Sequence, residues 1–159
     1  MSRLRTFNAN AWILIAAIFA FAADQITKHL VTSHMPYPDS VIVIPNLLKW
    51  TYERNTHGAF GLFGNNGVLL ILMAIVVLLI FWFSFRDQAA RSRLVCVAFG
   101  MIVGGAIGNI VDRVHLGYVV DFIDFYRIWP NIFNVGDSCI TCGVILLLLS
   151  SLGRSRRHA

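Results

Sequence analysis

Two aspartates border long apolar stretches of this sequence and together could hydrolyse an amide. Asp121 lies in the run VVDF (119–122), and Asp137 lies in the run FNVGDS (133–138). Two carboxylates at one apolar site tend to share a proton, because ionising both is costly. The ionised carboxylate can take a proton from water while the protonated one polarises a carbonyl. The pair predicts aspartyl hydrolysis without a metal or cofactor, although it would also suit a proton relay.

A structural reading of the same aspartates stays open. Asp137 and Ser138 could simply begin the last helix as its N-cap. Asp124, three residues after Asp121, precedes a stretch of aromatic residues, and we interpret it as a solvated side chain. Ser138 has no histidine at a spacing that would make it a nucleophile. The histidines also lack a metal-binding spacing, so no metal site is predicted.

Further polar residues could support the aspartate pair. Amides and a guanidinium can orient carboxylates, hold a substrate backbone and stabilise an oxyanion. The candidates are Asn55, Asn109, Arg113 and Asn134. Asn109 could instead form an interhelical hydrogen bond and Asn55 could be a turn residue. Asp112 could be no more than the local ion partner of Arg113.

The composition indicates that these residues are carried by an integral membrane protein. The 159 residues are 57% hydrophobic and 13% charged, which is too apolar for a small soluble domain. The sequence predicts one mainly α domain, residues 1–159, with four spans of about the length needed to cross a bilayer. These spans are residues 8–30, 67–86, 93–113 and 135–153. The glycines near Gly104 and Gly105 are expected to let helices approach closely.

Basic residues predict the orientation of the spans. Eight of the 13 Lys and Arg residues lie at the same ends of the predicted spans: Arg3, Arg5, Arg86, Arg91, Arg93, Arg154, Arg156 and Arg157. The positive-inside rule makes this side cytoplasmic. Both termini are therefore expected inside, with the two aspartates on the outer side. Basic residues at span ends serve orientation, so no nucleic-acid partner is predicted.

The two outer connections differ in character. Residues 36–66 contain β-prone segments around a Pro45-Asn46 turn signal and predict a small sheet on the outer membrane surface. This region is expected to close at a turn over residues 65–67. Residues 114–134 are interpreted as a second loop, whose aromatic side chains are typical of an interfacial belt.

The N-terminal run also resembles a cleavable signal peptide, with basic residues before an apolar core. We favour a retained first span, because Asp24 and Lys28 form an i,i+4 acid–base pair at its outer end. The three cysteines all lie in apolar runs and are interpreted as small packing residues rather than as a redox or zinc site. They are Cys96, Cys139 and Cys142.

The motifs, taken in order, resemble those of lipoprotein signal peptidase, the signal peptidase II family. They are Asp24-Gln25-x-x-Lys28, Asn55 to Phe60, Gly104 to Asn109 with Asp112-Arg113, Val120-Asp121-Phe122, and Phe133-Asn134-x-x-Asp137-Ser138. The resemblance covers nearly the whole chain. Each motif is weak alone, and their joint order makes the match strong.

The resemblance implies an aspartyl endopeptidase of the bacterial cytoplasmic membrane with Asp121 and Asp137 as its catalytic pair. It implies that the enzyme cuts prolipoproteins just before a diacylglyceryl-modified cysteine, on the periplasmic side, and that globomycin inhibits it. Asn55, Asn109, Arg113 and Asn134 fall on the family's polar active-site positions, and Asp24 and Lys28 on its N-terminal motif. The partners implied are prolipoproteins, membrane lipids and globomycin-type inhibitors, with no cofactor.

The chain departs from the family pattern at two places. The usual N-x-G-x-A-F reads Asn55-Thr56-His57-Gly58-Ala59-Phe60 here, and Gly136 replaces the usual alanine before Asp137. Two other classes remain as alternatives: a small proton-coupled carrier with the aspartates as its relay, and a membrane scaffold. The carrier would need acidic groups continuing inward, whereas the predicted inner halves of the spans contain none before Asp87.

Overall fold

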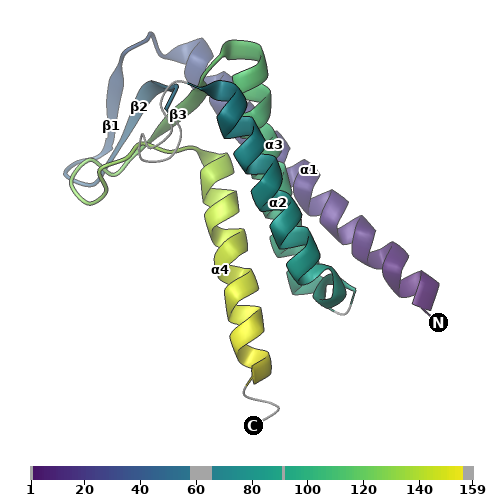
Figure 1. The fold of residues 1–159 in the computed structure, drawn as a ribbon. Helices are drawn as coiled ribbons and strands as arrows, with labels where there is room; N and C mark the ends of the chain where they lie inside the picture. Colours follow the sequence, from purple (N-terminus) through teal and green to yellow (C-terminus); the bar gives the residue numbers. More distant parts are fainter. Residues whose placement is uncertain (1, 58–65, 91, 156–159) are drawn as a thin grey trace.

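The protein is a helical assembly with a small sheet at one end (Figure 1). The computed structural model describes residues 2–57, 66–90 and 92–155. Residues 58–60 of the motif that begins at Asn55, residue 65 of the predicted turn, and Arg91, Arg156 and Arg157 lie outside this part. In chain order the elements are α1 (Ser2–His34), β1 (Ser40–Ile44), β2 (Leu48–Asn55), α2 (Gly67–Ala89), α3 (Arg93–Leu116), β3 (Val119–Asp124) and α4 (Val135–Ser155).

Local capping signals fix the ends of the helices. Asn66 is the N-cap of α2, and its Oδ1 accepts the backbone N–H of Leu69 over 3.1 Å. Gly117 is the C-cap of α3, and its positive φ of 80° suits glycine because glycine has no Cβ to clash. α1 ends at His34, shortly before Pro36, which cannot continue a helix. The helix therefore runs four residues beyond the span that ends at residue 30.

α3 is the central helix, and glycines let its neighbours approach it closely. A Cβ on Gly104 would collide with the carbonyl oxygen of Ala17 in α1. A Cβ on Gly105 would collide with the carbonyl oxygen of Gly136 in α4. The expectation that glycines serve close helix packing is confirmed, and α3 contacts both helices that carry polar residues toward the sheet.

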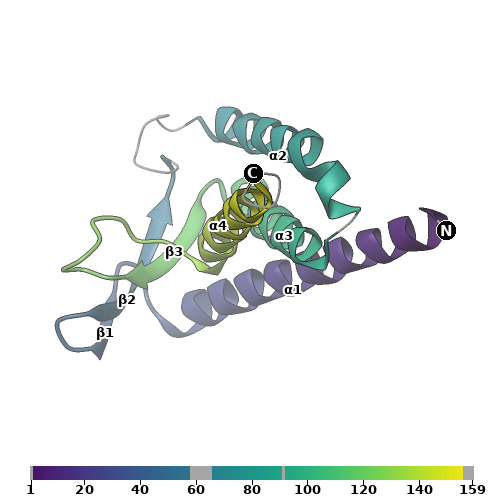
Figure 2. The ribbon, with the colours of Figure 1, turned by 90° about the horizontal axis from the view of Figure 1, so that it is seen from below.

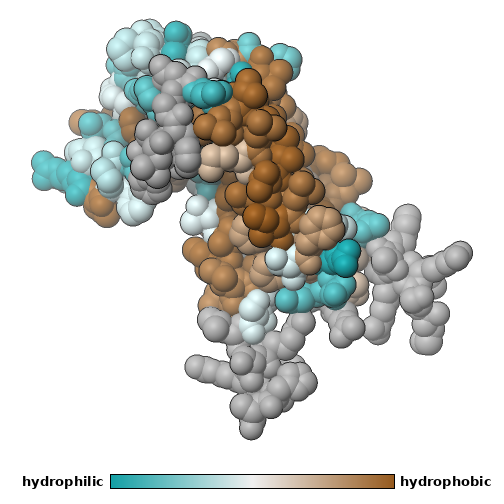
Figure 3. All heavy atoms as spheres, viewed as in Figure 1, coloured by the Kyte–Doolittle hydropathy of each residue, from teal (hydrophilic) through white to brown (hydrophobic). Residues whose placement is uncertain are grey.

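The outer surface of the helices is strongly apolar. Three helices, α1, α2 and α3, are long and apolar enough to cross a membrane among the residues that the structure describes. The apolar part of α4 is shorter, Val135–Ser151. Large apolar side chains of α2 are exposed, among them Val68, Ile80 and Phe83. Figure 3 shows this apolar surface over α2, with polar residues at both of its ends.

The sheet is antiparallel with the order β1-β2-β3. A turn at Asn46, whose φ is 63°, joins β1 to β2 and confirms the predicted hairpin. The interpretation of residues 114–134 as a loop was wrong in part, because Val119–Asp124 forms the third strand, pairing Glu53 with Asp121. Pairing across this distance in sequence depends on tertiary structure, which local patterns do not report.

One face of the sheet packs against the end of α1. Tyr52, Val120 and Phe122 are buried together with Val31 of α1. Phe122, which the sequence placed among interfacial aromatics, is only 5% exposed and belongs to this core. The sheet lies at the end of the molecule opposite the first turn of α1, the last turn of α4 and the α2–α3 connection (Figure 1).

Candidate active site

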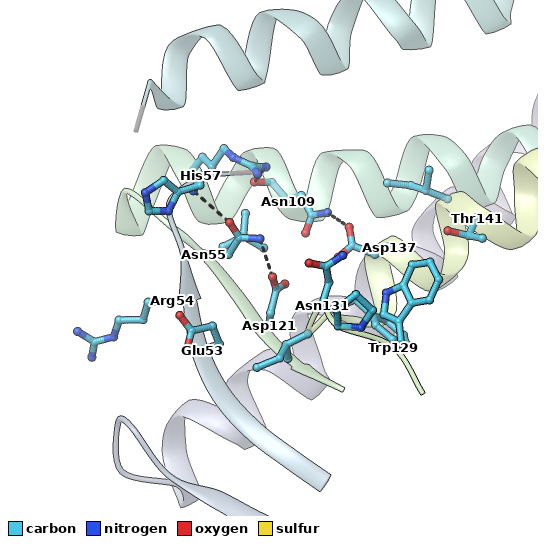
Figure 4. Close-up of a pocket in the computed structure, with 16 residues that line it drawn as sticks. Glu53, Arg54, Asn55, His57, Asn109, Asp121, Trp129, Asn131, Asp137 and Thr141 are labelled. Atoms are coloured by element: carbon cyan, nitrogen blue, oxygen red, sulfur yellow. Dashed lines mark hydrogen bonds between the residues drawn. The ribbon is translucent and has the colours of Figure 1, made fainter. Parts of the chain in front are cut away.

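A cavity of about 650 Å³ opens where the sheet meets α3 and α4 (Figure 4). Asp121 enters it from β3 and Asp137 from the first turn of α4. Polar and apolar side chains line it together: Glu53, Arg54, Asn55, His57, Asn109, Arg113, Val119, Trp129, Pro130, Asn131, Ile132, Phe133, Ile140 and Thr141. The structure thus brings the two predicted aspartates into one cavity.

Asp121 is buried and receives two amide hydrogen bonds. Its Oδ2 accepts the side-chain N–H of Asn55 over 2.8 Å, and its Oδ1 accepts that of Asn134 over 2.7 Å. The residue is only 2% exposed. Burial, followed by the negative charge of Asp137, raises the pKa of Asp121 to about 7, and the two hydrogen bonds only partly offset this. Near neutral pH the pair of carboxylates therefore holds a proton.

Asp137 is bound by residues from α3 and from the start of its own helix. Its Oδ1 accepts the side-chain N–H of Asn109 over 2.8 Å. The structure corrects the N-cap reading: Asn134 caps α4, with its Oδ1 accepting the N–H of Asp137 over 2.8 Å. Asp137 lies in the first helical turn, where the positive end of the helix dipole favours a carboxylate.

Asn109 presents its amide nitrogen to Asp137 for a clear reason. Its Oδ1 accepts the ammonium of Lys28 over 2.8 Å and the side-chain N–H of Asn134 over 3.1 Å. Because an ammonium can only donate, the oxygen of Asn109 must face Lys28. Its Nδ2 is left to donate to Asp137, so Lys28 determines the orientation of an amide that contacts the carboxylate pair.

Lys28 is itself held in a buried ion cluster below the cavity. Its ammonium lies 2.7 Å from Asp24 and 3.0 Å from Asp112, and both carboxylates are nearly inaccessible. Asp24 also accepts the backbone N–H of Gly136 over 2.7 Å, directly before Asp137. α1 thereby contacts the start of α4 through Asp24 and contacts Asn109 through Lys28.

Asp112 and Gln25 have roles that the sequence did not indicate. Asp112 pairs with Lys28 rather than serving as the local ion partner of Arg113, and it accepts the backbone N–H of Val120 over 3.1 Å. Gln25 donates to Asp112 over 3.0 Å. Gln25 directly follows Asp24 and lies on a different side of the helix, and this position was the sign in the sequence that Gln25 has a partner on another helix.

Two more residues complete the rim of the cavity. Arg113 donates to the backbone oxygen of Asn109 over 3.3 Å and contributes a positive charge that faces Asp121 and Asp137. The backbone N–H of His57 donates to Oδ1 of Asn55 over 3.1 Å, which turns the amide nitrogen of Asn55 toward Asp121 (Figure 4).

Asp124 was wrongly interpreted as solvated. It is 8% exposed, accepts the hydroxyl of Thr51 over 2.9 Å and lies 4.0 Å from the ammonium of Lys49. Asp124 does not line the cavity, although it shares β3 with Asp121. Cys142 also differs from the packing role expected of it, because its side chain is exposed, whereas Cys96 is buried as expected.

Comparison with known proteins places this geometry in a family. The family model described as signal peptidase (SPase) II matches residues 16–153. The chain belongs to the signal peptidase II family. It is 38% identical over 140 residues to a lipoprotein signal peptidase of Halothermothrix orenii, covering 86% of this chain and 92% of that protein. It is 42% identical over 135 residues to one of Caldanaerobacter subterraneus, covering 85% and 91%.

Solved structures agree with this membership of the signal peptidase II family. A bacterial membrane enzyme solved by the in meso method at 2.3 Å resolution matches with a TM-score of 0.82 and 33% identity. The alignment covers 92% of this chain and 91% of that one. A second, at 1.9 Å resolution, matches with a TM-score of 0.77 and 34% identity, covering 88% and 92%. As a member of this bacterial family, the protein is a membrane aspartyl peptidase. The family removes signal peptides from prolipoproteins.

Proposed function

We propose that Asp121 and Asp137 form the catalytic pair of this peptidase and activate water against the scissile amide. The carboxylate pair carries one proton near neutral pH. The ionised carboxylate takes a proton from water as the water oxygen bonds to the carbonyl carbon. The protonated carboxyl donates a hydrogen bond to the carbonyl oxygen, giving a tetrahedral oxyanion while the pair of carboxyls holds two protons. Collapse re-forms the C=O bond and breaks the C–N bond, and the leaving nitrogen takes one proton from the pair, which again holds one.

The observation that carries this proposal is the common hydrogen-bond network of the two carboxylates. Asn134 contacts both of them, donating its side-chain N–H to Asp121 over 2.7 Å and its backbone N–H to the carboxylate of Asp137 over 3.4 Å. Within this network, Asn55 and Asn109 would hold the carboxylates in position. Arg113 would stabilise the oxyanion or hold the substrate backbone.

Asp24 and Lys28 are proposed as positioning residues. Lys28 orients the amide of Asn109, and Asp24 fixes the backbone of Gly136 next to Asp137. Neither residue lines the cavity. Their effect on the reaction would therefore pass through Asn109 and the first turn of α4.

The proposed substrate is a prolipoprotein whose cysteine carries diacylglycerol, cut on the N-terminal side of that cysteine. The cavity suits a substrate that is partly lipid and partly peptide. Ile140, Thr141 and Trp129 line it along α4 and the neighbouring loop, while Glu53 and Arg54 line it from β2. Membrane lipids would surround the helices, and a globomycin-type peptide would compete for the same cavity.

In the proposed topology, α1 to α4 all span the bacterial cytoplasmic membrane, with both termini in the cytoplasm and the active site on the periplasmic side. The sheet lies at the opposite end from the first turn of α1 and the last turn of α4 (Figure 1). Arg86 and Arg93 flank the α2–α3 connection, which lies at the same end as these two turns, and this supports a cytoplasmic assignment for that end.

The proposal is tested by cleavage of a diacylglyceryl-modified prolipoprotein in detergent micelles. Asp121→Asn and Asp137→Asn keep the size of the side chain but cannot exchange the proton. Both variants are expected to lose at least about a thousandfold in kcat, the order that removal of an essential acid–base group costs. Asp124→Asn is the matched control, because it is a buried aspartate on the same strand outside the cavity. If either active-site variant keeps wild-type turnover, the assignment of that residue is wrong.

A further inference from the structure

The β1–β2 hairpin exposes apolar side chains on both of its faces. Val41, Ile42 and Ile44 are 49%, 61% and 45% exposed. The register places Val41 opposite Trp50, which is 47% exposed, on one face, and Ile42 opposite Lys49 on the other. Sheets that face water on one side normally alternate apolar and polar residues. An edge strand that is apolar on both faces is poorly suited to water.

A second exposed apolar segment lies beside this hairpin. It belongs to the loop after β3, in which Ile128 and Trp129 are 68% and 50% exposed. The ammonium of Lys49 lies 4.3 Å from the ring centroid of Tyr126, so the hairpin and the loop are in contact. Arg127, between Tyr126 and Ile128, is exposed. The two segments together form one apolar surface with aromatic and basic residues.

The position of this surface indicates what covers it. The hairpin turn and the loop extend sideways from the helices and lie level with the first turns of α4 (Figures 1 and 2). The helices of this protein are embedded in a membrane, so lipid headgroups lie beside those turns. Tryptophan and tyrosine concentrate at the membrane–water boundary, and basic side chains there meet anionic headgroups.

We propose that residues 41–50 and 126–129 form an interfacial platform that inserts into the headgroup region of the bilayer, with Arg127 facing anionic lipid. The occupant of this apolar surface is thus the lipid itself. Trp129 also lines the active-site cavity, so the platform forms a wall between that cavity and the lipid. This inference depends on the membrane location of the helices and not on which groups perform catalysis.

Site-directed spin labelling of the full-length protein in lipid nanodiscs tests the platform. The three cysteines would first be replaced by alanine, and single cysteines then introduced by Ile44→Cys, Ile128→Cys and Asp39→Cys for nitroxide labelling. All three positions are exposed, so labels there disturb no packing. Asp39 lies at the opposite end of β1 from the turn and serves as the water-exposed control. Accessibility to oxygen, which partitions into lipid, is compared with accessibility to a water-soluble nickel chelate.

The platform predicts that labels at positions 44 and 128 have an oxygen-to-nickel accessibility ratio several times that at position 39. It also predicts an effect of lipid charge on the label at position 128. Adding anionic lipid to a zwitterionic nanodisc should lower the accessibility of this label to nickel when Arg127 is present, but not when Arg127→Gln is added to the same labelled protein. Equal ratios at all three positions would overturn the proposal. So would lipid exposure at only one of the two segments, or dipolar broadening between labels of two copies, which would identify a protein contact instead.

Discussion

Asn134 and Asp137 hold each other at the start of α4. The Oδ1 of Asn134 accepts the backbone N–H of Asp137 over 2.8 Å, and the carboxylate of Asp137 accepts the backbone N–H of Asn134 over 3.4 Å. This reciprocal arrangement is that of a capping box. Because Asn134 also donates to Asp121, one residue both begins the helix and connects the two carboxylates.

The two contributions of Asn134 are separated by two substitutions. Asn134→Ser keeps a good N-cap but removes the N–H donor to Asp121, whereas Asn134→Ala removes both. A hydrogen bond to a charged group contributes about 1.5–3 kcal/mol, so both variants are expected to lose about tenfold to a hundredfold in kcat/KM. The alanine variant should have a free energy of unfolding about 1 kcal/mol lower than that of the serine variant, and it should therefore melt at a lower temperature. Wild-type kcat/KM in Asn134→Ser would show that the donor is dispensable.

Removal of Lys28 is expected to destabilise the fold strongly. Lys28→Met leaves Asp24 and Asp112 buried without their cation, which costs about 3–5 kcal/mol when a buried pair is broken. Adding Asp24→Asn to this variant should restore part of the loss. The measurement is thermal or denaturant unfolding in detergent. Lys49→Met is the control, since Lys49 lies 4.0 Å from Asp124 and is more exposed, and it should cost less than about 1 kcal/mol. Equal effects of the two single substitutions would contradict the importance of the buried cluster.

Gly105 is predicted to be intolerant of even one methyl group. Gly105→Ala places a Cβ against the backbone oxygen of Gly136, next to Asp137, so α3 and α4 must separate. We expect a loss of about 1–3 kcal/mol in stability together with reduced kcat. Gly67→Ala is the matched control, because a Cβ at that helical position has nothing within 4 Å among the described residues, and it should be neutral or slightly stabilising. A Gly105→Ala enzyme with unchanged stability would show that the helices can separate without cost.

The raised pKa of Asp121 predicts a specific dependence of stability on pH. A carboxyl whose folded-state pKa is about 7 binds its proton more tightly in the folded protein than in the unfolded chain, where the ordinary value is 3.8. Between these values the wild type loses stability as pH rises, by up to about 1.4 kcal/mol per pH unit. Asp121→Asn has no such proton to lose. Its melting temperature relative to wild type should therefore rise from pH 4 to pH 7 and level off above.

Thermal unfolding of both proteins in detergent between pH 4 and pH 8 measures this difference. The comparison reports the titration of the Asp121–Asp137 pair, because loss of the carboxylate at position 121 also removes the charge interaction between the two groups. A flat difference for Asp121→Asn would mean that Asp121 ionises as easily in the folded protein as in the unfolded chain.

The features that the sequence predicted well are those set by neighbours in the chain. Long apolar runs indicated helices that suit a bilayer, because the backbone must satisfy its own hydrogen bonds there. The β-prone segments around Pro45-Asn46 predicted a hairpin. The order of the predicted spans also placed Asp121 and Asp137 on the same, outer side of the membrane, which was enough to nominate them as a pair.

Tertiary structure alone decided how those elements meet. Residues 119–124 became a strand because β2 offered them a pairing edge, and Asp124 was buried because Thr51 and Lys49 satisfy it. Lys28 reached Asn109 because the glycines of α3 let α1 come close. Lys28 and Asn109 are 81 positions apart, and the periodicity of a single chain segment carries no information about the rotation and spacing of its distant partner.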